Sequence, residues 1–161
     1  MQQESLLVQF MILIRVVILM PLNLITKKCT TLSMFPAKFC SRILLLYTCW
    51  KELALTLKKS IRGSDVAVRW GGEEFIIITP KTTLEQAQQL AETIRQIVKS
   101  TPYSGVGQIT ASIGVASFEE NDSLKSLVQR ADVALYRAKK LGRNNVQIEC
   151  VTSRKQFDLG L

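Results

Sequence analysis

The stretch VAVRWGGEEFIIIT, residues 66–79, carries the clearest structural signal in this chain. Residues 66–70 and 75–79 are rich in β-branched and aromatic side chains, which is typical of strands. Gly71 and Gly72 separate the two runs, and glycines at this spacing favour a tight turn between paired strands. The stretch therefore predicts a β-hairpin with two glutamates at its tip.

Those glutamates, Glu73 and Glu74, are the first candidate functional residues. Adjacent carboxylates repel each other when they lose water, so a divalent cation is a natural partner for them. Gly71 and Gly72 have no Cβ and would let a ligand approach the backbone closely. The alternative interpretation is a solvated hairpin with two surface glutamates.

Apolar residues at helical spacing predict three helices around the hairpin. Before the hairpin, Leu53, Leu57 and Ile61 form one helical face, and Gly63 is expected to cap the C-terminus of that helix. After the hairpin, two further helices are expected to bury Leu84, Ala87, Leu90, Ala91, Ile94 and Val98 in the first, and Leu124, Leu127, Val128, Ala131, Leu135 and Ala138 in the second.

Capping residues and β-rich runs complete the predicted elements. Thr83, with Gln86 three residues later, is a capping box, and either Asp122 or Ser123 is expected to cap the last helix. Gly142 is expected to end that helix, and strands are expected at residues 109–118 and 145–149. Mixed strands and helices predict an α/β fold, an α+β sandwich in which helices pack on a mixed sheet.

Two pairs of charged residues are further candidates for binding. Lys139 and Arg143 are expected four residues apart at the end of the last helix, where they could grip phosphates. Basic residues there could equally complement the helix dipole, with no ligand. Arg62 and Asp65 lie three apart before the hairpin, a spacing that also fits a local turn with a surface ion pair.

Composition excludes several classes of function. The 161 residues contain no histidine, which excludes His-ligated zinc, His-bound haem and Ser-His-Asp triads. The net charge is +8, but no basic stripe with interleaved aromatic residues indicates a nucleic-acid polymer as partner. The four cysteines, without metal-ligand spacing, are interpreted as free thiols in a reducing compartment: Cys29, Cys40, Cys49 and Cys150.

Residues 1–50 differ in composition from the rest. They contain one acidic residue, Glu4, against five basic residues, and residues 29–50 show no clear helical or strand period. Residues 6–25 are long and apolar enough to be considered as a membrane helix, although Arg15 near the centre opposes insertion. We therefore expect residues 1–50 to be a separate hydrophobic, basic leader, either a membrane anchor or a segment translated in a shifted frame.

Several motifs together resemble the GGDEF domain of bacterial diguanylate cyclases, in its GGEEF variant. They are GGEEF at residues 71–75, the Arg-x-x-Asp motif that ends at Asp65, ASIGVA at residues 111–116, ADVALYRAK at residues 131–139 and GRN at residues 142–144. Their order and spacing match the family over residues 51–149. The resemblance assigns residues 51–150 to the C-terminal two-thirds of such a domain and residues 151–161 to a tail.

The resemblance implies a reaction and a set of site residues. The family joins two GTP molecules into cyclic di-GMP and releases pyrophosphate, with Mg²⁺ or Mn²⁺, between two domains that face each other as a homodimer. By position, Glu73 would be a metal ligand and catalytic with Glu74, and Gly71 and Gly72 would admit the nucleotide. In the same way, Lys139 and Arg143 would hold the triphosphate.

The resemblance also implies a product site and a deficiency. Arg62 and Asp65 match the site where cyclic di-GMP binds and inhibits the enzyme, and Thr93 stands where a further arginine often joins it. The family's first metal ligand is an aspartate on a central strand before the hairpin, followed by an asparagine and an aspartate that read guanine. No aspartate precedes Asp65 here. Residues 1–50 are apolar enough to replace that strand but cannot supply its ligands.

These expectations leave three functions open: a diguanylate cyclase, a degenerate module that binds cyclic di-GMP or GTP, and a remnant with no function of its own. The missing ligands favour a chain that is inactive alone. The expected location is the cytoplasm. The alternative is anchorage in the inner membrane through residues 6–25, with the GGDEF segment in the cytoplasm.

Overall fold

The computed structural model describes residues 10–17, 37–119 and 122–149. A five-stranded sheet has the order β2-β3-β1-β6-β7 and is mixed, because β6 and β7 are parallel and the other neighbours antiparallel. Its strands are β1 (Phe10–Val17), β2 (Val66–Gly71), β3 (Glu74–Thr79), β6 (Thr110–Ser117) and β7 (Val146–Glu149). The helices are α1 (Ala37–Ser60), α2 (Leu84–Ser100) and α3 (Leu124–Lys140).

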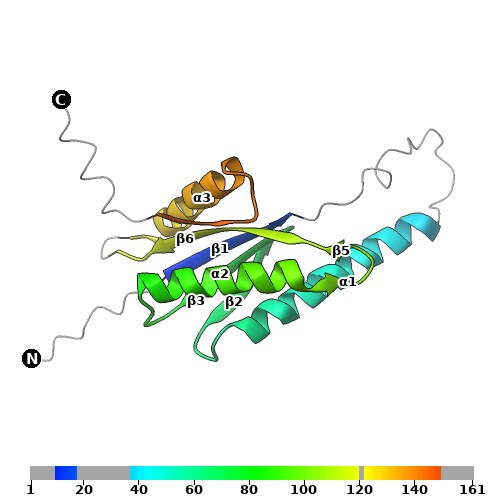
Figure 1. Cartoon of the computed structure of the whole chain (residues 1–161), viewed down its shortest axis with the longest axis horizontal. Coiled ribbons are helices and arrows are strands. Elements are labelled where there is room, and N and C mark those ends of the chain that lie inside the picture. Colours follow the sequence, from blue (N-terminus) through cyan, green and yellow to red (C-terminus); the bar gives the residue numbers. More distant parts are fainter. Residues whose placement is uncertain (1–9, 18–36, 120–121, 150–161) are drawn as a thin grey trace, which may run out of the picture.

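The helices cover both faces of the sheet (Figure 1). On one face, α1 and α2 pack with the odd-numbered residues of β3 and β6 in the larger core cluster, which includes Leu53, Ile77 and Ile113. On the other face, α3 packs against Ile76 and Ala116. This arrangement confirms the predicted fold class, a mixed sheet with helices packed on it.

The central strand of the sheet, β1, lies within residues 1–50. β1 pairs antiparallel with β3 on one side and with β6 on the other, so that Ile12 lies opposite both Ile77 and Val115. The expectation that residues 1–50 could fill this position is confirmed. A membrane helix over residues 6–25 is not what the structure has at residues 10–17, because their backbone groups pair with β3 and β6. The rest of that stretch lies outside the described residues.

The predicted hairpin is formed, with a two-residue connection between β2 and β3. β3 is largely buried, as its apolar sequence predicts, whereas β2 is an exposed edge strand. The pairing register shifts between Arg69 and Gly71, which is typical of a β-bulge. The structure also has a small ribbon that the sequence did not predict, formed by β4 (Pro102–Tyr103) and β5 (Gly107–Gln108).

The helix before the hairpin is longer than its sequence pattern indicated. α1 begins at Ala37, inside the stretch without clear periodicity, and ends at Ser60. Leu53 and Leu57 are buried as predicted. Gly63 is not the C-cap: it lies beyond the helix, in a turn where the Asp65 N–H donates to the Arg62 carbonyl. None of the helices in the described part of the chain combines the length and apolarity needed to cross a bilayer.

The predicted caps of α2 are confirmed. The Gln86 N–H donates to Thr83 Oγ1, and the Thr83 N–H donates to Gln86 Oε1, which completes the capping box. The residues predicted to form the apolar face of α2 are placed as expected. Ala87, Ala91, Ile94 and Val98 are buried, and Leu84 and Leu90 are partly buried and pack against the core.

At α3, Ser123 rather than Asp122 is the N-cap, and its partner in the capping box is Ser126. Gly142 follows the helix with φ of 101°, as expected of a terminating glycine. Leu124, predicted to be buried, is the first residue of the helix and is 60% exposed.

The cysteine prediction is tested only in part. Cys49 is a free thiol on α1, and burial raises its pKa. Cys29 and Cys150 lie outside the described residues, and Cys40 is described only as part of the α1 backbone.

Gly114 allows α3 to lie directly on the sheet. A Cβ at this position would be 2.2 Å from the Ala131 carbonyl oxygen and 2.5 Å from the Leu135 nitrogen, both backbone atoms of α3. Real Cβ atoms do not make contacts this short, and a helix backbone cannot move aside as a flexible side chain can. The absence of a side chain at Gly114 therefore sets the distance between α3 and β6.

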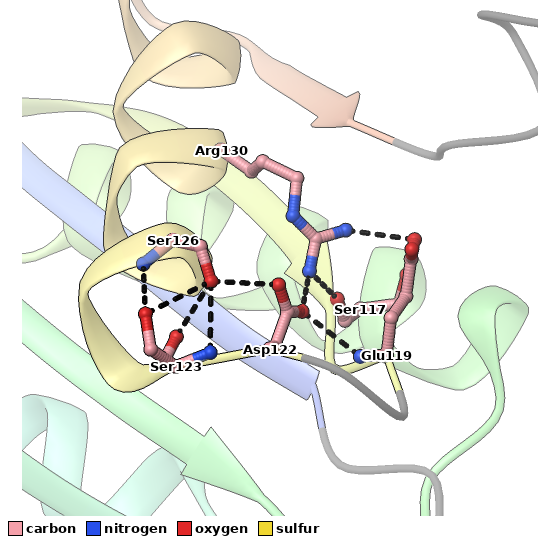
Figure 2. A network of polar contacts seen from close by, with 6 residues as sticks. All are labelled: Ser117, Glu119, Asp122, Ser123, Ser126 and Arg130. Carbon is pink, nitrogen blue, oxygen red and sulfur yellow. Dashed lines mark hydrogen bonds and ion pairs between the residues drawn. The ribbon is translucent and has the colours of Figure 1, made fainter.

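A partly buried ion-pair network holds the start of α3 (Figure 2). The Arg130 guanidinium donates to Glu119 Oε1 at 2.8 Å, to the Ser117 carbonyl at 2.7 Å and to Asp122 Oδ2. Asp122 Oδ1 accepts from Ser126 Oγ at 2.8 Å. The Arg130 and Asp122 side chains are only 11% and 10% exposed, so their charges depend on each other.

We predict that Gly114→Ala lowers the free energy of unfolding by about 2–3 kcal/mol, because the new Cβ pushes α3 off the sheet. Urea denaturation measures the loss. Gly63→Ala is the matched control: it meets nothing within 4 Å and should change stability by less than about 1 kcal/mol. Equal effects of the two substitutions would contradict the role given to Gly114.

We predict that Arg130→Met lowers the free energy of unfolding by about 3 kcal/mol, because it leaves two carboxylates near each other without their counter-charge. Lys125→Met, at an exposed position of the same helix, is the control and should stay within about 0.5 kcal/mol of the unmodified chain. Chemical denaturation of both variants checks this, and an Arg130→Met variant as stable as the control would refute it.

Candidate functional site

Residues of β2 and α1 stabilise the GGEEF turn. Arg69 Nη2 donates to the Gly72 carbonyl at 2.7 Å, and its guanidinium lies 5.2 Å from the centroid of the Trp50 ring. That ring lies 6.2 Å from the ring of Phe75. A cation that lies over an aromatic ring and donates to the turn carbonyl stabilises this conformation of the turn. Arg69 and Trp50 were not predicted as site residues, although Arg69 lies only two residues before Gly71.

Glu74 opens β3 and has a defined position in the sheet. Backbone register places it opposite Gly71 of β2 on one side and opposite Arg15 of β1 on the other. The space above Gly72 is open, since a Cβ there would meet nothing within 4 Å, and a Cβ on Gly71 would meet only Glu74 Oε2 at 3.5 Å. The glycines therefore leave room at the tip, as expected.

Lys139 and Arg143 are not arranged as the sequence predicted. Lys139 lies in the last turn of α3, but Arg143 is beyond the helix end. Gly142, Arg143 and Asn144 are three consecutive residues with positive φ, of 101°, 62° and 47°. The expected four-residue spacing on a helix face is thus wrong for Arg143, because the chain reverses at Gly142. Its exposed side chain is presented by a left-handed turn.

This left-handed turn is held by hydrogen bonds among residues that were not predicted as site residues. The Asn144 N–H donates to Ser112 Oγ at 3.2 Å, and Arg95 Nη1 donates to Asn144 Oδ1 at 2.8 Å. Arg95 is itself paired with Glu92, with an Nη2–Oε1 distance of 2.6 Å. Asn144 was visible in the GRN motif, and asparagine tolerates positive φ, but its partner Arg95 lies 49 residues away along the chain.

The GGEEF turn and the left-handed turn lie at the same end of the sheet. In β1, Arg15 is opposite Glu74 on one side and Ser112 on the other, and Ser112 accepts from Asn144. Two strand spacings put Glu74 and Ser112 about 10 Å apart. The structure thus brings the predicted glutamates and the turn that carries Arg143 to one edge, with Arg15 between them.

This edge does not fit the expected divalent metal. No group of three or more His, Cys, Asp or Glu side chains able to hold a metal occurs among the residues that the structure describes. β1, the strand beside β3, has the sequence FMILIRVV and no carboxylate, amide or hydroxyl side chain. Mg²⁺ and Mn²⁺ require oxygen ligands, which this strand does not supply.

Arg62 and Asp65 do not lie at the edge of the sheet that carries the GGEEF turn. Asp65, 8% exposed, accepts at Oδ2 from the Arg62 N–H at 3.0 Å and at Oδ1 from Ser64 Oγ at 3.2 Å, so it stabilises the turn between α1 and β2. The Arg62 side chain is exposed, and the described residues show no ion pair between the two. This turn lies at the opposite end of β2 from the glycines, about 17 Å away by strand length.

A hollow of about 360 Å³ lies beside Asp65, between α1 and β2. Leu57, Ile61 and Phe75 contribute apolar surface, and Lys58 and Arg69 contribute positive charge. Thr93, on the exposed side of α2, donates from Oγ1 to the Gln89 carbonyl at 2.8 Å and is not among the residues that line this hollow.

Comparison with known proteins identifies the family. A family model described as "Diguanylate cyclase, GGDEF domain" matches residues 48–145. The chain belongs to the GGDEF family. Diguanylate cyclase DgcM of Escherichia coli K12 is 51% identical over 94 residues, and the response regulator PleD of Caulobacter vibrioides is 41% identical over 102 residues. These matches cover 58% and 60% of this chain but only 23% and 22% of those proteins.

Solved structures support the same family. An active GGEEF domain of a diguanylate cyclase from Vibrio cholerae superposes with a TM-score of 0.65 at 29% identity, covering 89% of this chain and 83% of that one. The GGDEF domain of DgcB from Caulobacter crescentus, in complex with c-di-GMP, gives 0.67 at 23% identity over 89% of this chain and 78% of that one. The second likeness concerns the fold alone.

We predict that the ion pair holding the left-handed turn makes stability depend on acid pH. The hydrogen bond from Arg95 lowers the pKa of Glu92, so its contribution is present above the unfolded-state pKa and is lost as pH falls through the folded-state value. Glu92→Gln should therefore be less stable at neutral pH, by less than about 1 kcal/mol because the Glu92 side chain is 42% exposed.

The difference between the Glu92→Gln variant and the unmodified chain should shrink below about pH 4.5, as the carboxylate becomes protonated. Urea denaturation at a series of pH values measures it. Asp132→Asn, an exposed carboxylate on α3, is the matched control. A difference that stays constant, or grows, on acidification would contradict the assignment.

Proposed function

We propose that this chain is a GGDEF domain that does not synthesise cyclic di-GMP by itself. The observation that carries the proposal is the identity of the strand beside the GGEEF motif. β1 lies between β3 and β6 and contributes Arg15, but no carboxylate, at the edge where Glu74 begins β3. Membership of the family alone does not establish activity, because the chain corresponds to 23% of the length of DgcM.

The chemistry of the expected reaction explains why one carboxylate cluster is insufficient. Joining two nucleotides requires in-line attack on a phosphate and stabilisation of the charge that develops on its oxygens. Divalent metals in such sites are held by several oxygen ligands, which also orient the attacking and leaving oxygens. Glu73 and Glu74 would be the family's metal-binding and catalytic residues here, and without further ligands they leave a metal incompletely held.

Residues that would contact a nucleotide are nevertheless present. The open tip at Gly71 and Gly72 leaves room for a ligand, and Lys139 and Arg143 supply positive charge that would attract a triphosphate. Arg143 is exposed, and the hydrogen bonds of Asn144 fix the turn that carries it. GTP binding without turnover is therefore the activity that we assign to this edge.

A second candidate function is binding of cyclic di-GMP at Arg62 and Asp65. Asp65 holds the turn by accepting from the Arg62 backbone N–H, and the Arg62 side chain is exposed. Its guanidinium would meet a phosphate, as arginine commonly does. Thr93 supplies no positive charge where the family often has an arginine, so we expect this affinity to be weak.

The remaining proposals concern the chain as a whole. We assign residues 1–50 to a leader of separate origin, residues 51–150 to the GGDEF segment and residues 151–161 to a tail, on the change in composition near residue 50. Homodimerisation would be needed for any turnover between two GTP sites. A cytoplasmic location fits a domain whose nucleotide ligands are cytoplasmic.

The test of turnover is incubation of the whole chain with GTP and Mg²⁺ or Mn²⁺, with mass spectrometric detection of cyclic di-GMP. The expected yield equals that of the Glu73→Gln/Glu74→Gln variant, which lacks both charges. An active GGEEF domain serves as the positive control. Product above the level of the double variant would overturn the proposal of inactivity.

The test of binding is titration calorimetry with GTP and, separately, with cyclic di-GMP. Heat with GTP that is lost in Arg143→Ala would support the nucleotide edge, and heat with cyclic di-GMP that is lost in Arg62→Ala would support the second site. Lys81→Ala, an exposed residue beyond the far end of β3, is the control for both. No heat with either ligand would leave the chain without a ligand-binding function.

A further inference from the structure

Arg15 has an unusual position in this fold. It is the single charged residue of β1, and β1 is flanked by β3 and β6 in the middle of the sheet. A charged residue is costly in such a strand unless another charge compensates it. Backbone register supplies that compensation: Arg15 is the cross-strand neighbour of Glu74.

The register also determines the face of the sheet to which Arg15 belongs. Residues paired across antiparallel strands lie on the same face, so Arg15, Glu74 and Ser112 belong to one row across the sheet. Gly114 and Ile76, two residues further along their strands, contact or pack with α3, which puts this row on the α3 face. The left-handed turn, through Asn144, approaches the same row at Ser112.

We propose that the positive charge of Arg15, which the register puts in the same row as Glu74, opposes the binding of a divalent cation by Glu73 and Glu74. Directly opposed residues in a sheet have Cβ atoms about 5 Å apart, close enough for opposite charges to stabilise each other. A divalent cation at Glu74 would meet the like charge of Arg15, which disfavours its binding. The row that contains Glu74 thus includes a cationic residue of the chain itself.

This inference deepens the proposed function and rests on the same edge, but it is tested without nucleotide or turnover. A chain that makes no cyclic di-GMP yet binds Mn²⁺ would refute the inference and leave the proposed inactivity standing. A chain that makes cyclic di-GMP would refute the proposed function whatever its affinity for Mn²⁺ alone. The two failures are therefore distinguishable.

The experiment is titration of the whole chain with Mn²⁺, in which electron paramagnetic resonance measures the free ion. We expect no saturable binding by the unmodified chain or by Arg15→Lys, which keeps the charge. Arg15→Asp should bind Mn²⁺ with an affinity higher by on the order of tenfold or more, because it replaces the like charge by a third carboxylate. Glu73→Gln in the Arg15→Asp background should remove that gain.

Lys81→Asp is the matched control, since it makes the same charge reversal at an exposed position beyond the far end of β3. The inference is overturned if the unmodified chain shows saturable Mn²⁺ binding that Glu73→Gln abolishes. It is also overturned if Arg15→Asp gains no more affinity than Lys81→Asp. Circular dichroism verifies that each variant is folded before titration.

Arg15→Asp could unfold a central strand, so a second measurement uses milder changes. In a double-mutant cycle of Arg15→Gln and Glu74→Gln, urea denaturation reports whether the two charges stabilise each other. We expect the two changes to be non-additive, by about threefold or more in the unfolding equilibrium constant. Additive effects would show that Arg15 does not act on Glu74 and would refute the proposal.

Discussion

The pairing of β1 with both β3 and β6 is the constraint on which the rest of the sheet depends. β3 and β6 do not pair with each other, so without β1 each would present unpaired backbone N–H and C=O groups to solvent or to another chain. The pairing register of β1 also matters. Successive residues of a strand belong to opposite faces of the sheet, so a shift of the pairing by one residue would exchange the two faces. A run of seven apolar residues with one arginine satisfies both demands.

The same pairing determines the chemistry available at the GGEEF edge. A strand in this position contributes its residues to the row that contains Glu74 and Ser112, whatever the origin of the strand. Here that contribution is a cation. The fold of a GGDEF domain thus forms with a central strand that has no carboxylate, because a sheet requires apolar, extended residues, whereas catalysis requires particular oxygen atoms at particular positions.

On the α3 face, close packing and polar contacts act together to position the remaining site residues. Gly114 lets the backbone of α3 approach β6, and Arg130 ties the start of the helix to the end of that strand. At the other end of α3, Arg95 reaches from α2 to Asn144 and holds the left-handed turn. The place of Arg143 therefore depends on residues from both faces of the sheet.

The sequence by itself determined what local chemistry controls: the glycine turn and its strands, the cap at Thr83, the end of α3 at Gly142, and through its motifs the family. It did not determine the beginning of α1 or the position of Arg143, because helix length depends on packing and a left-handed turn reverses the chain. Only the tertiary structure decided that Phe10–Val17 is the central strand and that Arg15 lies opposite Glu74. Pairing between distant segments is a property of the assembled sheet, and no local pattern encodes it.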